Sequence, residues 1–303
     1  MTTRVLAFGG SGQLAGELSR LPVSADLEVV VRGRPAADII DRNAVDRAIG
    51  EVQPAVLVNA AAYTAVDRAE DEPEAAFAVN ETGPHNLAQA ATATGIPLVQ
   101  VSTDYVFDGS KVGAYGEVDP VAPLGVYGRS KEAGERAVRA ACPAHIILRT
   151  AWVYSPFGKN FVRTMLNVGR NHDRLSVVDD QVGNPTSAGD IAQAILAIAV
   201  KLRQDDKDYG TYHFAGHGAT SWCGFAREIF RQANAMTGRP SPEVVAIPSS
   251  QWPTKASRPA NSQLDCTRIR ETFGIHPPGW PESLNTVLRD LLTSELPGVR
   301  GQP

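Results

Sequence analysis

Two residues whose chemistry suits proton transfer, Tyr127 and Lys131, stand four positions apart in the stretch YGRSK. On a helix this spacing places both side chains on one face, one turn apart. A phenol has an ordinary pKa of about 10, and a neighbouring ammonium favours its ionised form. The pair therefore suits a general acid that protonates an oxygen as it becomes an alkoxide. Because the same spacing also arises by chance on exposed helices, the surrounding sequence has to decide between the two interpretations.

A glycine-rich loop near the N-terminus offers a site for a dinucleotide. It has the spacing G-x-x-G-x-x-A and lies between an apolar run at 4–8 and a helical pattern at 13–20. Glycine permits the tight turn and lets backbone N–H groups approach a pyrophosphate at the helix N-terminus. The flanking strand and helix favour dinucleotide binding over a plain strand–helix turn. The residues expected to contact the cofactor are Gly9, Ser11, Gly12, Gln13 and Leu14.

The end of the second apolar run bears on which cofactor is bound. Arg32 stands where an acidic residue would contact the ribose 2′-hydroxyl in an NAD enzyme. An arginine there can instead pair with a 2′-phosphate. The alternative is that Arg32 and Arg34 are both solvated loop charges, and the sequence leaves the two interpretations open.

Short apolar runs alternate with helical patterns in the first half of the chain. Strands are expected at 4–8, 27–31, 55–58, 98–101 and 145–148, and helices at 13–20, around 45–49, at 74–94 and at 130–141. This order implies parallel strands joined by right-handed crossovers. We therefore predict an α/β fold with a doubly wound parallel sheet of the Rossmann type.

The alternation loosens after residue 149, where proline and glycine become frequent. Helices are expected at 191–203, 225–235 and 283–292, a strand at 211–215, an irregular functional or disordered segment at 247–259 and a frayed tail at 295–303. We predict a dinucleotide-binding Rossmann domain at 1–152. A smaller, mainly substrate-binding α/β domain would cover 153–303, with some of its elements returning to the Rossmann sheet.

The composition argues against several classes of partner. The 303 residues carry a formal net charge of −4 and no basic run, which disfavours nucleic-acid binding. The cysteines Cys142, Cys223 and Cys266 are odd in number and far apart, so they resemble reduced thiols rather than a metal site. No apolar stretch approaches the roughly 18 residues of a membrane span. The strand pattern begins at once, without a signal peptide. We expect a cytoplasmic protein.

Five longer motifs are more specific than the loop or the Tyr–Lys pair. They are NAAAYTAVD at 59–67, STDYVFDG at 102–109, RTAWVY at 149–154, DQxGxPT at 180–186 and RPxNSxL at 258–264. Together with the glycine loop they resemble the dTDP-4-dehydrorhamnose reductase family of the extended short-chain dehydrogenase/reductase superfamily. The matches run from Gly9 to Leu264 and so cover nearly the whole chain.

The resemblance implies that Thr103, Tyr127 and Lys131 are catalytic. Thr103 would hydrogen-bond the C4 carbonyl of the sugar, and Tyr127 would protonate that oxygen as hydride arrives from the nicotinamide. Lys131 would bind the nicotinamide ribose and lower the Tyr127 pKa. Thr103 also ends its strand at the carboxyl edge, where open α/β sheets bind ligands. A β-forming residue that merely closes a strand is the alternative for this position.

Other contacts are implied by the resemblance alone. The cofactor would be contacted by Asp38 and Ile39 at the adenine and by Ala60, Ala61, Ala62, Tyr63 and Thr64 after the third strand, and the nucleotide-sugar by Asp104 and Trp152. The Trp152 indole could cover the apolar face of a deoxy-sugar, or it could be a core aromatic. Turn chemistry beside Gly109 is the alternative for Asp104 and the preferred interpretation for Asp108.

Two further matches carry weaker expectations. Asn80 matches a helix asparagine of the superfamily whose part is mainly structural. Some members of the family bind Mg²⁺ at a dimer contact through glutamates, and Glu17 could match one of these. The other glutamates have no counterpart that can be placed, so we predict no metal.

The function implied by the resemblance is the reduction of dTDP-4-dehydro-L-rhamnose to dTDP-L-rhamnose. NADPH would be the hydride donor, with NADH as an alternative, and the resemblance allows a homodimer. One competing hypothesis is a non-catalytic NADP-binding regulatory subunit of the methionine adenosyltransferase type, since a fold can persist while its function changes. Another is a reductase or epimerase of a different nucleotide 4-keto sugar. The intact Thr103–Tyr127–Lys131 set favours an enzyme.

Overall fold

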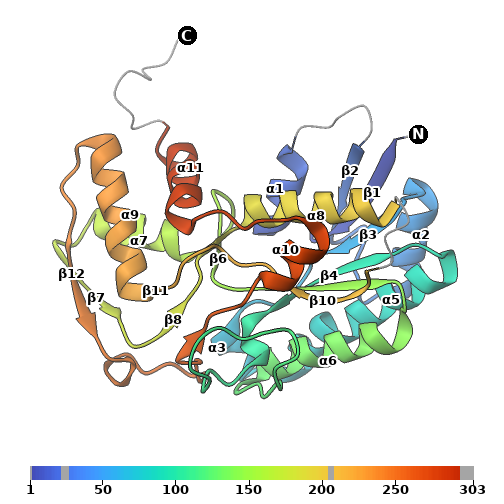
Figure 1. Cartoon of the computed structure of the whole chain (residues 1–303), viewed down its shortest axis with the longest axis horizontal. Coiled ribbons are helices and arrows are strands. Elements are labelled where there is room, and N and C mark those ends of the chain that lie inside the picture. The colour runs from blue at the N-terminus through green and yellow to red at the C-terminus, as the bar shows by residue number, and fades with distance from the viewer. Residues whose placement is uncertain (1, 22–26, 204–207, 294–303) are drawn as a thin grey trace, which may run out of the picture.

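A six-stranded parallel sheet organises the larger part of the fold in this computed structural model, which describes residues 2–21, 27–203 and 208–293, and it lies on the right in Figure 1. Its strands are β1 (Thr3–Phe8), β2 (Leu27–Arg32), β3 (Val56–Asn59), β4 (Leu98–Thr103), β5 (His145–Thr150) and β10 (Gly210–His213). They run in the order β10-β5-β4-β3-β1-β2, and every neighbouring pair is parallel. The predicted Rossmann-type α/β sheet is confirmed. The tail predicted at 295–303 lies outside the described residues.

Helices cover both faces of this sheet, as expected for parallel strands buried on two sides. The helices of the first half are α1 (Gln13–Arg20), α2 (Arg42–Val52), α3 (Val66–Ala69), α4 (Pro73–Phe77), α5 (Gly83–Thr94) and α6 (Val126–Ala141). One apolar core joins the sheet to α1 and to a later helix, α8 (Ala188–Arg203). The other core joins it to α2, α5 and α6. Figure 1 shows these two layers on opposite sides of the strands.

The helix predicted at 74–94 is interrupted by one π-helical turn, η1 (Ala78–Thr82), between α4 and α5. Asn80 lies in this turn and is buried. Its amide nitrogen donates to Ser130 Oγ at 2.9 Å, and its oxygen accepts from the Tyr63 backbone N–H at 2.9 Å. The wider turn thus lets Asn80 tie the loop after β3 to α6, which the periodicity of a regular helix does not predict.

Helix α6 begins at Val126, four residues before the predicted start. Both Tyr127 and Lys131 therefore lie on this helix, in its first two turns. Gly128 packs against the backbone of Tyr105 so closely that a side chain would collide with it. The start of α6 is consequently pressed against the segment that follows β4.

The later part of the chain contributes both to the sheet and to a separate cluster of helices. Its remaining elements are α7 (Phe161–Gly169), α9 (Trp222–Thr237), α10 (Thr267–Phe273), α11 (Trp280–Leu292), β6 (Val153–Tyr154), β7 (Arg174–Val178), β8 (Val182–Gly183), β9 (Thr186–Ser187), β11 (Thr220–Ser221), β12 (Glu243–Ile247), β13 (Asn261–Ser262) and the 3₁₀ turns η2 (Asp104–Val106) and η3 (Ser249–Gln251). Helices α7, α9 and α11 pack on one another through a core of their own. In contrast, α8, α10 and β10 pack on the Rossmann sheet. A domain boundary at residue 152 stays a prediction.

The segment predicted to be irregular, 247–259, contains only the short turn η3 beyond the end of β12. It is nevertheless anchored to α3. Arg258 makes a two-pronged ion pair with Asp67, at 2.8 and 2.7 Å, and the Ala256 N–H donates to the same carboxylate at 3.0 Å. These contacts join the end of the NAAAYTAVD motif to the start of the RPxNSxL motif.

Candidate active site

A cavity of about 700 Å³ lies along the carboxyl ends of the central strands. Such an edge is where open α/β sheets bind ligands, and the volume is sufficient for a nucleotide cofactor's reactive end and a small substrate. Its lining includes Gly9, Ser11, Gly12, Gln13, Leu14, Asp38, Ile39, Ala60, Ala61, Ala62, Thr64, Thr103, Asp104, Tyr127, Lys131 and Trp152. The fold thus brings most of the predicted site residues to one cavity.

The glycine loop closes one end of the cavity by packing backbone against backbone. The N–H groups of Gly9 and Gly10 donate to the Arg32 carbonyl at 3.0 and 3.1 Å. Gly10 has a φ of +54°, and a side chain at Gly33 would come within 2.7 Å of the Gly10 nitrogen. Helix α1 then starts at Gln13 without a side-chain cap. Its first N–H groups are left for an anion, the arrangement that a cofactor pyrophosphate requires.

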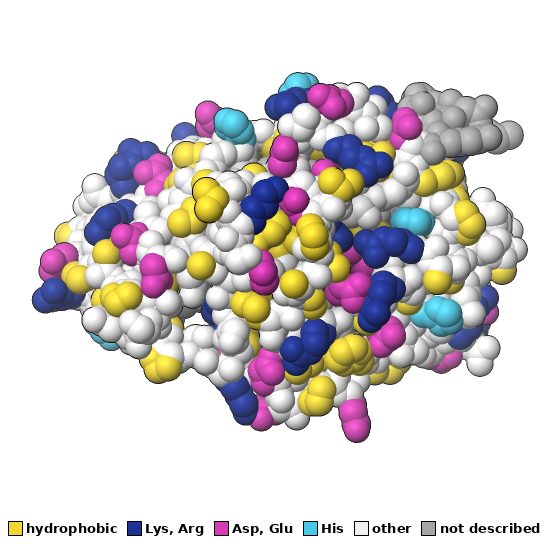
Figure 2. Space-filling model, turned by 60° about the horizontal axis from the view of Figure 1, so that its bottom comes forward, with side chains coloured by type: hydrophobic (Ala, Val, Ile, Leu, Met, Phe, Trp, Pro, Cys, Tyr) yellow, Lys and Arg dark blue, Asp and Glu magenta, His cyan; other side chains and the backbone are white. Residues whose placement is uncertain are grey.

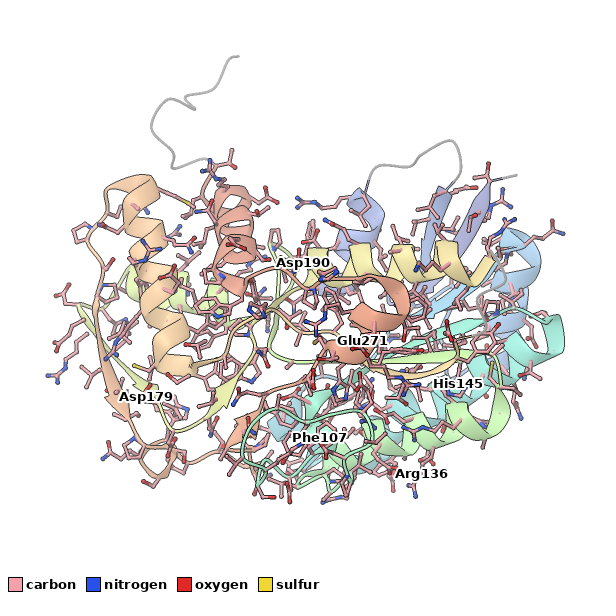
Figure 3. The ribbon with its side chains drawn as sticks, viewed as in Figure 1. Phe107, Arg136, His145, Asp179, Asp190 and Glu271 are labelled. Atoms are coloured by element: carbon pink, nitrogen blue, oxygen red, sulfur yellow. The ribbon has the colours of Figure 1, made fainter. Side chains whose placement is uncertain are left out.

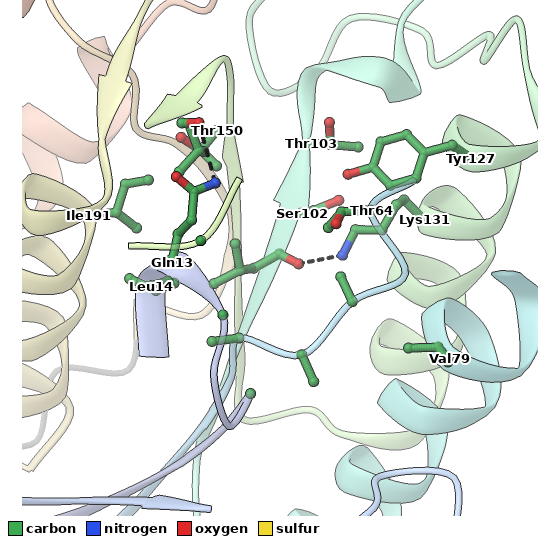
Figure 4. A pocket seen from close by; sticks show the side chains of 18 of the residues that line it. Gln13, Leu14, Thr64, Val79, Ser102, Thr103, Tyr127, Lys131, Thr150 and Ile191 are labelled. Carbon is green, nitrogen blue, oxygen red and sulfur yellow. Dashed lines mark hydrogen bonds between the residues drawn. The ribbon is translucent and has the colours of Figure 1, made fainter. Parts of the chain in front are cut away.

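Thr103, Tyr127 and Lys131 lie together on another wall of the cavity (Figure 4). Thr103 is the last residue of β4. Its Oγ1 donates to Asp104 Oδ1 at 3.0 Å and accepts from the Tyr105 N–H at 3.2 Å. Lys131 Nζ donates to the carbonyl of Val101 at 2.8 Å, and Val101 lies two residues before Thr103 on β4. The three side chains are almost fully buried, so the surrounding protein holds each of them in place.

Burial shifts the pKa values of this group. It raises the pKa of Tyr127 to about 12, while the Thr103 hydroxyl acts in the opposite direction. Burial also lowers the pKa of Lys131 to about 8, against the attraction of Glu135 one turn further along α6. Desolvation is the largest effect on the Tyr127 pKa, and the Lys131 ammonium is turned onto the Val101 carbonyl. That Lys131 lowers the Tyr127 pKa stays a prediction.

Three polar atoms in the buried lining have no hydrogen-bond partner among the described residues: Ser102 Oγ, Asp104 Oδ2 and Thr150 Oγ1. An unpaired buried polar atom is costly, so such atoms indicate a place that a ligand or water completes. Desolvation raises the pKa of Asp104 to about 6. Together with the free helix N-terminus, these atoms fit a polar cofactor and a hydroxylated substrate.

Trp152 combines features of both of its predicted roles. It lines the cavity and also packs on the cores around α9 and around Phe107. Its indole stacks face to face on Trp222, with ring centroids 3.5 Å apart. Trp222, the first residue of α9, lines the same cavity and belongs to none of the five sequence motifs. Only its position in the folded chain reveals it.

Two predicted cofactor residues lie outside the lining. Arg32 is exposed, and its guanidinium donates to the neighbouring Val31 carbonyl at 3.2 Å. The Tyr63 hydroxyl donates to Glu72 at 2.8 Å. In place of Arg32 the lining contains Arg34, the other arginine of this loop, and Lys159 from the loop before α7. A residue's direction in a turn decides which of two nearby arginines reaches the cavity.

Nothing in the described residues identifies a metal centre or a membrane span. Glu17 is buried, with Arg20 Nε 3.4 Å from its carboxylate. Within residues 2–21, 27–203 and 208–293, no group of three or more His, Cys, Asp or Glu could hold a metal ion. The same residues include no helix that is both long and apolar enough to cross a bilayer.

Asp108 accepts hydrogen bonds from Ser110 in a tight turn, as expected.

The Rossmann sheet, the glycine loop and the Thr–Tyr–Lys wall define a member of the extended short-chain dehydrogenase/reductase class. The family model described as RmlD substrate binding domain matches residues 3–293, and the chain belongs to this family. It is 45% identical over 291 residues to the dTDP-4-dehydrorhamnose reductase of Sinorhizobium fredii, covering 95% of this chain and 98% of that protein.

Solved structures agree with this assignment. A dTDP-4-dehydrorhamnose reductase from Bacillus anthracis, in complex with NADP, superposes with a TM-score of 0.89 at 33% identity, over 96% of this chain and 100% of that one. A dTDP-4-dehydrorhamnose reductase from Clostridium acetobutylicum gives a TM-score of 0.88 at 39% identity with the same coverage. The resemblance read from the sequence motifs is confirmed.

Proposed function

We propose that this chain reduces dTDP-4-dehydro-L-rhamnose to dTDP-L-rhamnose with NADPH. The observation that carries the proposal is the common cavity, which a dinucleotide-type glycine loop closes at one end and Thr103, Tyr127 and Lys131 line at another. Membership of a family whose curated relatives are dTDP-4-dehydrorhamnose reductases supports the substrate. The NADP complex of a relative supports the cofactor.

The bound nicotinamide supplies the hydride, and the chain supplies orientation and the proton. The Thr103 hydroxyl donates to Asp104 in the absence of substrate, and rotation about its Cβ–Oγ bond redirects the proton to a carbonyl oxygen in the cavity. This hydrogen bond polarises the carbonyl and fixes its position.

Tyr127 donates the proton that the reduced oxygen requires. An alkoxide is a much stronger base than a phenolate, so the transfer is favourable even from a phenol with a pKa of about 12. A phenolate left in a buried site needs a nearby cation, and Lys131, one turn away on α6, provides it. The Val101 carbonyl holds the ammonium in place until a ligand hydroxyl competes for it.

Asp104 completes the polar surface for the sugar. Its Oδ2 is buried without a partner, and an ionised carboxylate accepts hydrogen bonds from hydroxyl groups. A sugar hydroxyl placed beside the reacting carbonyl would satisfy this oxygen. The same contact would orient the ring with respect to Thr103.

The proposal is tested by following NADPH absorbance with dTDP-4-dehydro-L-rhamnose, made in situ from dTDP-glucose by the two preceding enzymes of the pathway. We expect consumption of NADPH and formation of dTDP-L-rhamnose, and none when the sugar precursor is omitted. A folded protein that binds NADPH but consumes none would refute the reductase assignment and favour the regulatory-subunit hypothesis. Turnover only with another nucleotide 4-keto sugar would correct the substrate.

A cytoplasmic location and a homodimeric assembly also form part of the proposal. The three cysteines are free thiols in the structure, which agrees with a reducing compartment. The side chains on the face shown in Figure 2 are interspersed in sign, with no continuous basic patch for a nucleic acid. Light scattering on the purified protein measures the mass and thereby tests the dimer.

A further inference from the structure

The stacked tryptophans join two parts of the chain that are far apart in the sequence. Trp152 directly follows β5 of the central sheet, and Trp222 begins α9 in the separate helical cluster. Their ring planes differ by only 7°, at a centroid distance of 3.5 Å. Both residues line the cavity. The pair therefore connects the wall that carries the sheet's edge to the wall that carries α9.

The stack leaves no face of Trp152 for a ligand. A side-chain carbon at Gly183 would lie 2.5 Å from Cε2, 2.7 Å from Nε1 and 2.9 Å from Cζ2 of the indole. Cε2 is bonded to both Nε1 and Cζ2, and an approach in the plane of the ring would meet one of those two atoms first. Because Cε2 is the nearest atom, the Gly183 backbone packs over a face of the indole. Trp222 stacks on one face, so Gly183 packs on the opposite face. The face-on contact with a deoxy-sugar that the sequence suggested is blocked.

The backbone of Trp152 needs such support. Its φ of +47° lies in the left-handed region, which bulky L residues rarely adopt unless neighbouring contacts hold them there. Trp222 is itself held firmly. Phe161 packs against it at a centroid distance of 4.7 Å. The preceding residue, Ser221, caps α9 by accepting from the Gly224 N–H at 2.9 Å and also bonds Asp179, which Figure 3 labels near the end of β7.

We propose that Trp222 is a positioning residue for the nucleotide-sugar, and this inference rests on the proposed function. It holds Trp152 so that the indole edge, and not a ring face, meets the substrate. Among the residues that the structure describes, neither indole N–H has a hydrogen-bond partner. The edge of Trp152 thus presents an N–H donor to an oxygen of the nucleotide-sugar. The site thus recognises the sugar through the Trp152 N–H, and the direction of this donor depends on the position of α9.

The test compares Trp222→Ala, Trp222→Phe, Trp152→Ala and the Trp152→Ala/Trp222→Ala double variant. Trp222→Ala should raise KM for the nucleotide-sugar about tenfold, a change that corresponds to about 1.4 kcal/mol. The dissociation constant of NADPH should stay unchanged. Trp222→Phe keeps an aromatic ring in the same core, guards against loss of the fold and should recover part of the effect. The double variant should be no worse than Trp152→Ala, because the two residues act as one unit.

Circular dichroism provides a readout of the stack itself. Two stacked indoles couple their transitions, and an in-plane rotation of one ring relative to the other turns this coupling into a paired positive and negative band, which Trp222→Phe and Trp152→Phe should both abolish. Trp252→Ala is the matched control, because Trp252 is 60% exposed and lies outside the cavity lining. This control should keep both the paired band and the wild-type KM.

The outcomes separate this inference from the function on which it rests. A folded Trp222→Ala protein that loses the paired band but keeps the wild-type KM would overturn the positioning role, as would additive effects in the double variant. If the unmodified protein shows no turnover, the proposed function fails instead. Calorimetric binding of dTDP-L-rhamnose then makes the same comparison among the variants, with the weaker binding expected for Trp222→Ala.

Discussion

The cavity lining has a buried part and an exposed part that differ in how each can act on a ligand. The buried lining consists of Thr103, Asp104, Tyr127 and Lys131, which are between 3% and 9% exposed. The exposed lining includes Ser11, Gly12, Arg34 and Lys159. Water and salt screen charges in the exposed part, whereas burial strengthens every electrostatic interaction and shifts pKa values in the other. A single substitution should therefore change catalysis or stability more in the buried lining than it changes ligand binding in the exposed lining.

The division also follows the chemistry that each part has to perform. The transfer of a proton to a carbonyl oxygen requires a single donor at a defined distance, and packing provides that precision. In the proposed function the cofactor's phosphates would be held by several backbone N–H groups and cations together. The loss of one such contact leaves the others.

Tyr127→Phe removes only the phenolic proton donor from the buried lining. General acid catalysis is typically worth about 10²–10⁴-fold, so kcat should fall by about that factor. NADPH binding should persist, because the ring still fills its place. Stopped-flow or steady-state NADPH oxidation measures the change. Tyr209→Phe, which alters a tyrosine outside the lining, is the control. Near-normal turnover in Tyr127→Phe would remove the hydroxyl from the mechanism.

Asp104→Asn tests how strongly burial acts in the same lining. The Asp104 pKa is about 6 in the folded protein and 3.8 without burial, so the unfolded chain loses this proton at lower pH. The stability that Asp104 contributes is therefore fully present below about pH 4 and is lost as the pH rises through 6, by up to about 3 kcal/mol for a shift of about two units. Asparagine keeps the acceptor for Thr103 but carries no charge.

The Asp104→Asn protein should consequently be more stable than the unmodified protein at pH 8 and about equally stable at pH 4. Urea unfolding at the two pH values measures the difference. An identical pH dependence in both proteins would mean that water reaches Asp104 and that its burial has little electrostatic consequence. The variant should also raise KM for the nucleotide-sugar, since a carboxylate oxygen is lost.

Arg34→Ala removes a cation from the exposed lining. If Arg34 pairs with the 2′-phosphate, NADPH affinity should decrease about tenfold to a hundredfold, the range for a charge-assisted hydrogen bond of about 1.5–3 kcal/mol. NADH affinity should hardly change. Screening by water should place the result near the lower end.

Arg32→Ala is the matched control for this change, because Arg32 belongs to the same loop but lies outside the lining. Fluorescence titration with NADPH and NADH measures all four affinities. Selective loss of NADPH binding in Arg32→Ala instead would restore the interpretation drawn from the sequence. It would also show that the side chain reorients when the cofactor binds.

Several parts of the site could be predicted because they depend on local structure. The glycine spacing, the Tyr–Lys interval and a threonine at the end of a strand are each set within one turn or one element. Helix boundaries were less accurate. The early start of α6 and the π turn at Asn80 arise because these residues pack against partners on other elements, Tyr105 and Ser130. Local periodicity contains no information about such partners.

The sequence by itself determined the fold class, the family and the residues expected to transfer the proton, since these are carried by repeated patterns and contiguous motifs. Only the tertiary structure decided that Arg34 and not Arg32 reaches the cavity, that Gly33 packs on Gly10, and that Trp222 stacks on Trp152. The physical reason is the same in each case. Side-chain direction in a turn and contact between distant segments are settled by packing of the whole chain, where excluded volume permits one arrangement and rejects its neighbours.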